Sequence, residues 1–219
     1  MNTTITVLMA VYNTDFVLVR RAIDSVLNQN FVQFELIVID DGSDYFLGQQ
    51  ILGYCQVHQH KIRYIQHQNC GQSQSFNRGV LLSSGKYIAI IDSDDEYKPN
   101  HLSACLKEIL DADLICSFTD TIVSCEEDYF VPDKDNHQKS IHVDKCILFA
   151  TLFGKREVFL QLSFINMYAA DAYFFENAAL QYRVKKVNLC TYIYYRNNSN
   201  SVSAKLKKKQ LLSMETSNN

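Results

Sequence analysis

Glycine and proline are scarce in this chain of 219 residues, which holds seven glycines and two prolines. Such low counts exclude collagen-like, linker-rich and low-complexity sequences. The chain shows no self-similar period, which excludes a repeat protein. Net charge is only −3 and 47% of the residues are hydrophobic, so the composition also excludes an intrinsically disordered chain. We expect one compact globular domain, or two halves that share a core.

Glycine-rich phosphate-binding loops are also missing. Neither G-x-G-x-x-G after the first expected strand nor G-x-x-x-x-G-K-[ST] occurs in the sequence. We therefore do not expect a nicotinamide-dependent dehydrogenase or a P-loop NTPase. A diphosphate bound by this protein would need a metal ion to neutralise its charge.

The chain has no segment suited to crossing a membrane or to secretion. The uncharged, mostly apolar stretch Val158–Ala170 is too short to span a bilayer and contains Gln161, Ser163 and Asn166. The N-terminus has no basic region, and the apolar run Ile5–Tyr12 is interpreted as a core strand rather than a signal peptide. These features predict a cytoplasmic protein.

The seven cysteines include no C-x-x-C pair, and their number is odd. This pattern indicates free and mostly buried thiols in a reducing compartment, rather than disulfides or a zinc site. His58 and His60 have no acidic or cysteine partner close in sequence, so we interpret them as surface or capping residues.

Charge is distributed unevenly along the chain. Eight basic residues and one acidic residue, Glu215, lie from Arg183 to Asn219, whereas the rest of the chain has 13 basic and 23 acidic residues. A basic C-terminal tail on an acidic body favours contact with a diphosphate, a phospholipid surface or an acidic partner. A solvated, lysine-rich terminal helix is an equally good interpretation.

Short apolar runs alternate with helical segments over the first hundred residues. Strands are expected over four ranges, listed in chain order: Ile5–Val11, Phe34–Asp40, Ile62–Gln66 and Tyr87–Ile91. Helices are expected between and after them: Phe16–Asn28, Tyr45–His58, Gln72–Ser83, and a fourth that starts near Pro99. This alternation predicts an α/β fold with a doubly wound, mostly parallel sheet and helices on both faces.

The second half is less regular, and we see no linker before it. Strands are expected at Leu114–Phe118, Thr121–Cys125, Val184–Leu189 and Thr191–Tyr195. Helical segments are expected near Val143–Ala150, Lys155–Leu162 and Asp171–Gln181, with a surface loop at Pro132–Ser140. Both halves are therefore predicted to share one sheet in a single domain.

Two acidic clusters follow the second and fourth expected strands, namely Asp40-Asp41-Gly42-Ser43 and Asp92-Ser93-Asp94-Asp95. Ligands of open α/β sheets bind at this edge. Neighbouring carboxylates repel one another unless a cation holds them, and Mg²⁺ or Mn²⁺ binds through such oxygens together with substrate phosphates. The pattern predicts a divalent metal that bridges a nucleoside diphosphate, although Asp-Ser-Asp also occurs in ordinary turns and helix caps.

The ordered set of motifs resembles glycosyltransferase family 2, whose members have the GT-A fold and use nucleotide sugars. The similarity is close over about the first hundred residues. It rests on five segments: Ala10-Val11-Tyr12-Asn13; Asp40 to Ser43; Asn69-Cys70-Gly71 with Asn77-Arg78-Gly79; Ser84 to Ile88; and Asp92 to Asp95. The resemblance divides the chain into a nucleotide-sugar-binding half (1–100), an acceptor-binding half (101–204) and the basic tail (205–219).

The resemblance also implies roles for individual residues. Tyr12 would stack on the nucleotide base, Asp41 would hydrogen-bond it with Asp40 alongside, and Asp94 would hold the metal with Asp92 near the ribose or the metal. The remaining donor-binding residues implied are Ala10, Asn13, Gly71, Asn77, Arg78, Ser93 and Arg196, of which Arg196 would meet phosphate.

Residues Tyr168–Phe175 resemble the segment that carries the family's catalytic base, which would be Asp171. Inversion at an anomeric carbon needs one carboxylate to take the proton of the attacking hydroxyl. Asp171 opens an expected helix, where the helix dipole favours its ionised form. Taken without the resemblance, Asp171 is an ordinary residue of a helix N-terminus.

The sequence departs from the family pattern at four places. Ala10 stands where the family usually has proline, and Ala170 stands where an acidic residue usually precedes the catalytic base. Phe76 stands where the family usually has arginine, and Arg78 could take the place of that arginine. All six histidines precede Val143, so a C-terminal histidine ligand is missing, and Asn198, Asn200 or water would take its place.

The function expected is therefore an inverting, metal-dependent glycosyltransferase. It would move a sugar from a nucleoside-diphosphate donor, expected to be a UDP-sugar, to a hydroxyl of a glycan or lipid-linked acceptor. Its cofactor would be Mn²⁺ or Mg²⁺, its basic tail would contact the inner membrane face, and no nucleic acid would bind. Two alternatives stay open: a nucleotidyltransferase, and a catalytically impaired module that binds nucleotide sugars.

Overall fold

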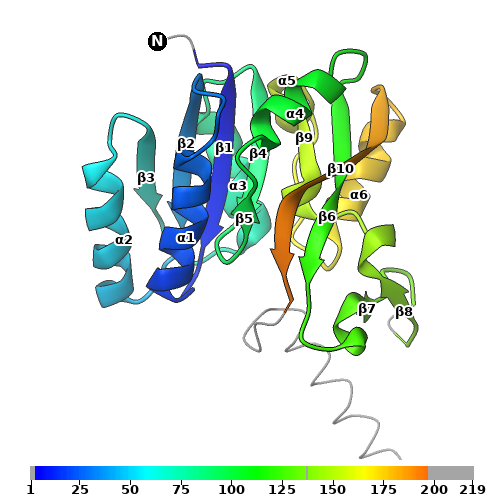
Figure 1. Cartoon of the computed structure of the whole chain (residues 1–219), viewed down its shortest axis with the longest axis horizontal. Coiled ribbons are helices and arrows are strands. Elements are labelled where there is room, and N and C mark those ends of the chain that lie inside the picture. The colour runs from blue at the N-terminus through cyan, green and yellow to red at the C-terminus, as the bar shows by residue number, and fades with distance from the viewer. Residues whose placement is uncertain (1–2, 137, 197–219) are drawn as a thin grey trace, which may run out of the picture.

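In this computed structural model, which describes residues 3–136 and 138–196, strands from both halves of the chain form one sheet of eight strands. The strand order is β3-β2-β1-β4-β9-β6-β10-β5, so the first half supplies one side of the sheet and the second half most of the other (Figure 1). The mixed α/β single-domain fold predicted from the sequence is thereby confirmed.

Four parallel strands make up the first side, at the positions the sequence predicts. They are β1 (Ile5–Val11), β2 (Phe34–Asp40), β3 (Ile62–Gln66) and β4 (Tyr87–Asp92). Every residue of β1 is buried, as expected of a central strand that is covered on both faces. Because all four strands run the same way, their carboxyl ends meet at one edge of the sheet.

Helices cover both faces of this sheet. Their bounds are α1 (Phe16–Leu27), α2 (Tyr45–Val57), α3 (Gln72–Leu82), α4 (His101–Glu108), α5 (Arg156–Gln161) and α6 (Ala170–Ala179). Alternate residues of β1 contribute to two hydrophobic clusters: Val7 packs with α1, α2 and α4 on one face, and Leu8 packs with α3, α5 and α6 on the other. Helices on both faces are what the sequence predicts of a doubly wound sheet.

The remaining strands of this sheet differ from those that the sequence suggests. They are β5 (Glu96–Tyr97), β6 (Leu114–Ile122), β9 (Leu152–Lys155) and β10 (Val184–Tyr195). The two strands expected over 114–125 are one strand, and the pair expected over 184–195 is also one strand. A shift in register between Val187 and Tyr192 lies where the break was expected, and β10 pairs with β6 on both sides of it.

Two further expectations are wrong in the second half. Strand β9 was not anticipated; it pairs antiparallel with β4 and with β6 and joins the two sides of the sheet. The helix expected at Val143–Ala150 is replaced by two 3₁₀ turns, η2 (Val143–Lys145) and η3 (Phe149–Thr151). The Thr151 hydroxyl holds the backbone of Leu148 by accepting its N–H at 3.3 Å and donating to its carbonyl at 2.7 Å, which favours a local turn over a helix.

A short hairpin flanks the loop that was expected at Pro132–Ser140. It comprises β7 (Phe130–Pro132) and β8 (Ser140–His142), and it follows a 3₁₀ turn, η1 (Glu126–Tyr129). Among the helices of residues 3–136 and 138–196, none combines the length and the apolar composition that a bilayer crossing needs. The basic tail at 205–219 lies outside the described residues, as do Asn198 and Asn200.

Candidate active site

The predicted site residues gather at the edge where the parallel strands β1, β2 and β4 end (Figure 1). β1 is hydrogen-bonded to β2 on one side and to β4 on the other, and Val11 pairs with Asp40 while Ala10 pairs with Asp92. The two acidic clusters therefore flank the end of β1. Helices α3 and α6, on the second face of the sheet, carry Asn77, Arg78 and Asp171, whereas Arg196 follows β10.

The first acidic cluster begins with Asp40, which is completely buried. Its carboxylate accepts hydrogen bonds from the Ser43 N–H at 2.8 Å, the Tyr64 hydroxyl at 2.6 Å and the Gln66 side chain at 3.1 Å. All three partners are internal, so Asp40 fixes the turn after β2. Its predicted contact with the nucleotide remains untested.

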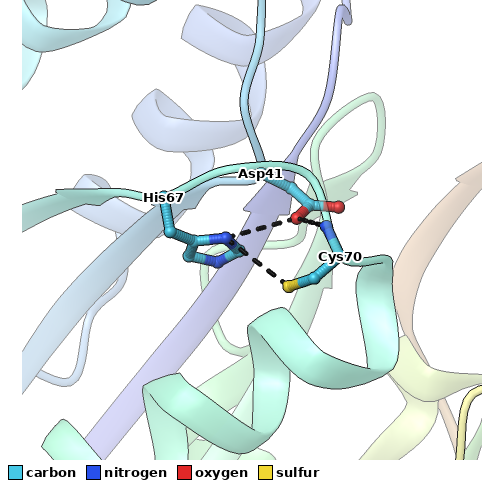
Figure 2. Close-up of side chains that lie close together, drawn as sticks. All are labelled: Asp41, His67 and Cys70. Atoms are coloured by element: carbon cyan, nitrogen blue, oxygen red, sulfur yellow. Dashed lines mark hydrogen bonds and ion pairs between the residues drawn. The ribbon is translucent and has the colours of Figure 1, made fainter.

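Asp41 holds the loop that enters α3 (Figure 2). Its two carboxylate oxygens accept the backbone N–H groups of Cys70 at 2.8 Å and Gly71 at 2.9 Å, and the side-chain amide of Asn69 at 3.3 Å. The Nδ1 atom of His67 lies 3.4 Å from the carboxylate. Asp41 is 3% exposed, and its carboxylate caps backbone N–H groups at the start of α3.

Two glycines allow this arrangement because both have positive φ angles. Gly42 has φ +82°, and a Cβ there would lie 2.8 Å from the backbone nitrogen of Asn69. Gly71 has φ +93°, and a Cβ there would lie 3.0 Å from the side chain of Asn166. Side chains larger than hydrogen are therefore strained at both positions, and the close approach of the β2 and β3 loops depends on them.

The end of β1 presents Tyr12 to solvent. Tyr12 is 54% exposed, whereas Ala10, before it on the strand, is 9% exposed. Asn13 follows with a φ of +50°; its N–H donates to the Ser43 hydroxyl at 3.0 Å, and its side-chain oxygen accepts the Asp44 N–H at 2.8 Å. Asn13 thus ties the β1 loop to the β2 loop and leaves the Tyr12 ring free to meet a flat ligand.

Helix α3 carries two candidates with different environments. Asn77 exchanges hydrogen bonds with the backbone of Phe164, at 2.8 Å and 2.9 Å, so its amide is engaged inside the protein. Arg78 is exposed on the same helix. Phe76, at the position where the family usually has arginine, is fully buried between Phe149 and Phe164. The polar contact expected of an arginine there is replaced by core packing.

The second acidic cluster contains carboxylates that repel one another. Burial raises the pKa of Asp92 to about 7, with further contributions from the negative charges of Asp94 and Asp171. Gln72, at the start of α3, donates to Asp92 at 2.9 Å and opposes this rise. The backbone carbonyl of Asp94 accepts from Arg21 at 2.5 Å, and the Ser93 hydroxyl is 2.8 Å from that of Thr14. These contacts fix the loop after β4 and leave an excess of negative charge at its tip.

Asp95, by contrast, is built into the core. It accepts hydrogen bonds from the Tyr192 hydroxyl at 2.5 Å and from the Tyr195 N–H at 2.8 Å. Burial, followed by the charges of Asp92 and Asp94, raises its pKa well above the usual range. Asp95 therefore joins β10 to the loop after β4, and we assign it a structural role.

Asp171 is the second residue of α6, one position later in the helix than the sequence suggests. Its carboxylate accepts the N–H of Ala172 at 2.8 Å and that of Phe149 at 3.1 Å. Burial raises the pKa of Asp171 to about 6, and these backbone hydrogen bonds oppose the rise. Since the charge of Asp171 raises the pKa of Asp92, the two carboxylates are close enough to interact. Asp92, Asp94 and Asp171 therefore belong to one electrostatic cluster although they come from distant parts of the chain.

Arg196, the last described residue, points to the segment around η1 and β7. Its guanidinium donates to the backbone carbonyls of Asp128 and Phe130 and to the Tyr194 hydroxyl. These contacts occupy the side chain with protein groups, and its predicted contact with phosphate remains untested.

Three residues of this edge were not anticipated as parts of the site. His67 was given no role, Cys70 appeared only within the segment Asn69-Cys70-Gly71, and Gln72 was noted only as the start of a helix. The position of the first two, directly after the third strand and before the third helix, could have indicated them, because that position lies at the same edge as the acidic clusters. No comparable signal marks Gln72.

The fold and this edge together define a GT-A type of architecture. The structure superposes on TarS from S. aureus in complex with UDP-GlcNAc with a TM-score of 0.71 and 17% identity, covering 93% of this chain and 61% of that one. It also resembles a mannosyltransferase from Pyrobaculum calidifontis in complex with GDP-Man and Mn²⁺, with a TM-score of 0.69 and 15% identity over 88% of this chain and 57% of that one. At these identities the likeness concerns the fold.

Sequence comparison identifies the family. The sequence model of Glycosyl transferase family 2 matches residues 6–196, so the chain belongs to this family and the predicted resemblance is confirmed. Glycosyltransferase GlyA of Streptococcus pneumoniae is 33% identical over 107 residues, which are 49% of this chain and 15% of that protein. The uncharacterized glycosyltransferase YibD of Escherichia coli is 29% identical over 158 residues, 70% of this chain and 43% of that protein. The chain thus spans less than half the length of these relatives.

Proposed function

We propose that this chain transfers a sugar from a nucleoside-diphosphate sugar to a hydroxyl acceptor, with inversion at the anomeric carbon. The observation that carries the proposal is the electrostatic cluster of Asp92, Asp94 and Asp171 at the carboxyl edge of the sheet. A transferase of this kind needs both a group that neutralises a leaving diphosphate and a carboxylate that takes a proton.

The donor would lie across the ends of β1, β2 and β4. Tyr12 is exposed and would stack on the nucleotide base. Asp41 is held by the N-terminus of α3 and would accept a hydrogen bond from the same base. A UDP-sugar is the donor class we favour, since TarS was solved with UDP-GlcNAc and with UDP. The mannosyltransferase neighbour was solved with GDP-Man, which makes GDP-sugars the first comparison in a test of donors.

Asp92 and Asp94 are the residues that would hold a divalent cation, Mn²⁺ or Mg²⁺. Their mutual repulsion fits this role, because a bound cation would supply positive charge between them and relieve the repulsion. When bound, such an ion would neutralise charge on the departing diphosphate.

Asp171 would act as the general base. As the acceptor oxygen attacks the anomeric carbon, its proton passes to the Asp171 carboxylate, and the bond from the anomeric carbon to the diphosphate breaks with its electron pair on the leaving group. A base with a pKa of about 6 is ionised at neutral pH and still basic enough to take a proton. The N–H groups of Ala172 and Phe149 hold the carboxylate in a fixed orientation.

The acceptor would be a hydroxyl of a glycan or of a lipid-linked saccharide. Relatives with matching segments include a succinoglycan biosynthesis protein of Rhizobium meliloti, 30% identical over 114 residues, and this supports a role in polysaccharide synthesis. Contact of the basic tail with the inner membrane face belongs to the same proposal, and that tail lies outside the described residues.

The test is a panel of nucleotide sugars incubated with the protein and Mn²⁺, followed by measurement of the released nucleotide. Asp171→Asn should abolish transfer while metal-dependent donor binding persists. Glu176→Gln is a matched control, since Glu176 lies on the same helix but is exposed and pairs with Lys134. Wild-type transfer by Asp171→Asn would overturn the assignment of the base.

Other products of the same assay identify the alternatives. Pyrophosphate release would indicate a nucleotidyltransferase, and donor binding without release would indicate a binding module. Asp94→Ala should weaken donor binding in the presence of Mn²⁺, and an unchanged affinity by calorimetry would remove Asp94 from the metal site.

A further inference from the structure

Three potential metal ligands of different chemistry converge beside the start of α3. They are a carboxylate oxygen of Asp41, the Nδ1 atom of His67 and the sulfur of Cys70, and all three lie within 4.8 Å of one another (Figure 2). Asp41 follows β2, whereas His67 and Cys70 lie in the loop between β3 and α3. The packing of two loops against each other therefore creates the cluster, and no spacing in the sequence predicts it.

Two of the three distances between these atoms match those of a tetrahedral zinc complex, and the third, from the Asp41 oxygen to the Cys70 sulfur, is within 4.8 Å. Nδ1 of His67 lies 3.4 Å from the Asp41 oxygen and 3.5 Å from the Cys70 sulfur. Ligands at the usual Zn–N, Zn–O and Zn–S bond lengths are separated by about 3.3–3.7 Å in a tetrahedral complex. A cation could thus be inserted with small adjustments of the three side chains.

We propose that Asp41, His67 and Cys70 form a binding site for a thiophilic divalent cation such as Zn²⁺, separate from the carboxylates that would hold the metal of the donor. A thiolate and an imidazole select Zn²⁺ over Mg²⁺, which prefers oxygen ligands. Three protein ligands leave the fourth position to water. This site revises the expectation that none of the cysteines takes part in metal binding.

Ligation through Nδ1 would require a change of tautomer at His67. In the metal-free protein Nδ1 also lies 2.9 Å from the Gln68 carbonyl, a contact that requires a proton on this nitrogen. The other nitrogen, Nε2, lies 3.3 Å from the Ser75 hydroxyl, which can accept a hydrogen bond from Nε2 when the proton is on that nitrogen instead. A cation would therefore shift the tautomer, with Ser75 orienting the ring as outer-shell partners of zinc histidines do.

Access and charge are compatible with a bound ion. Cys70 and His67 are partly exposed, whereas Asp41 is buried, so two of the three ligands are accessible from solvent. Burial, with the Asp41 carboxylate beside it, raises the pKa of the Cys70 thiol, and a cation would displace this thiol proton. The positive charge of Arg78 opposes this rise in the pKa of Cys70.

The test uses the full-length chain, reduced and metal-free, titrated with Co²⁺. We expect one equivalent to produce the near-ultraviolet charge-transfer absorption of a thiolate ligand, and one equivalent of Zn²⁺ to abolish it. Cys70→Ser keeps the backbone N–H that Asp41 accepts, and it should lose the band and at least about tenfold in Zn²⁺ affinity. His67→Gln should lower the affinity in the same way.

Two variants serve as controls. Cys190→Ser removes an exposed thiol on β10 and should keep the band, and Asp94→Ala alters the other metal site and should also keep it. No thiolate band in the native chain, or a band that persists in Cys70→Ser, would overturn the proposal.

One consequence rests on the proposed function. Because Asp41 would bind the nucleotide base, Zn²⁺ should weaken UDP binding, measured in excess Mg²⁺, in the native chain but not in Cys70→Ser. If the Co²⁺ spectra support the site and Zn²⁺ leaves the UDP affinity unchanged, the metal site stands and the assignment of Asp41 to the base fails. If no thiolate band appears while UDP binds normally, the metal site fails and the proposed function is unaffected.

Discussion

Replacing Asp92 with asparagine should make the metal-free protein more stable at alkaline pH. The side chain of Asp92 has its pKa raised from 3.8 to about 7 in the folded state, mainly by burial and then by Asp94 and Asp171. The folded state therefore binds a proton that the unfolded state has already lost between these two values. The stabilisation this proton provides is complete below about pH 4 and is lost as the pH rises through about 7.

The size of the effect follows from the shift. About three pKa units at 1.4 kcal/mol each give an upper bound of about 4 kcal/mol. Asp92 is only partly buried, and solvent screening reduces this to about 1–2 kcal/mol. In a chain of this size the gain corresponds to about 2–8 °C in Tm. The amide oxygen of the introduced asparagine would still accept the hydrogen bond from Gln72, so the contact at 2.9 Å is kept in the variant.

The assay is thermal unfolding of native and Asp92→Asn proteins in a chelator, from about pH 4 to pH 8. We expect equal stability at the acid end and a gain for the variant at the alkaline end. Excess Mn²⁺ should then reverse the ranking, because an ion that binds only the native state stabilises it by about 2.7 kcal/mol at a hundred times Kd. Asp111→Asn, an exposed carboxylate near Lys185, is the control and should show no such pH dependence. A variant that is no more stable than the native chain at pH 8 would refute the reasoning.

Three further predictions concern the same edge. The rate of transfer should fall about tenfold per pH unit below about 6, since the pKa of Asp171 is raised to about 6 and only its ionised form accepts a proton; a rate independent of pH between 5 and 8 would contradict its role as the base. Tyr12→Ala should weaken nucleotide binding about tenfold in calorimetry with no change in Tm, because the ring is 54% exposed and supports no core contact. Phe76→Ala should lower the free energy of unfolding by about 3–4 kcal/mol in urea titrations, since it empties a fully buried position between Phe149 and Phe164, whereas an arginine-like surface role would predict almost no loss.

The sequence was sufficient for the first half of the fold and less so for the second. Strands β1 to β4 are apolar runs bounded by polar turns, and a helix of ordinary length separates each pair, so local pattern and final structure agree. Strand β9 has four residues, including Gly154, and forms only because β4 and β6 pair with it on either side. Such a strand depends on tertiary contacts that no local pattern contains. The same holds for β10, which the sequence predicts as two strands and which pairs with β6 on both sides of a register shift.

The candidate site shows the same division. The carboxylates were visible because each acidic cluster ends an apolar strand, and parallel strands end together. What the residues do within the site was less visible. Asp40, Asp95 and Asn77 have the residue types expected of ligand-binding groups, yet each joins separate segments of the protein through its hydrogen bonds. His67 and Cys70 show the opposite case, since their chemistry appears only when the loop after β3 folds back on Asp41.

The start of α3 explains how these parts form one site. The Gly71 N–H donates to Asp41, on the side where the base would bind, and the adjacent Gln72 side chain donates to Asp92, on the side where the diphosphate would lie. The Ser73 hydroxyl donates to the Ile165 carbonyl, which belongs to the segment that leads into α6 and Asp171. Three consecutive residues of one helix end therefore contact three stretches of chain that contribute carboxylates. A displacement of this helix end would alter the binding of the nucleotide base, the binding of the metal and the position of the general base Asp171 together. Changes at Gly71 should therefore lower both donor affinity and turnover, rather than only one of them.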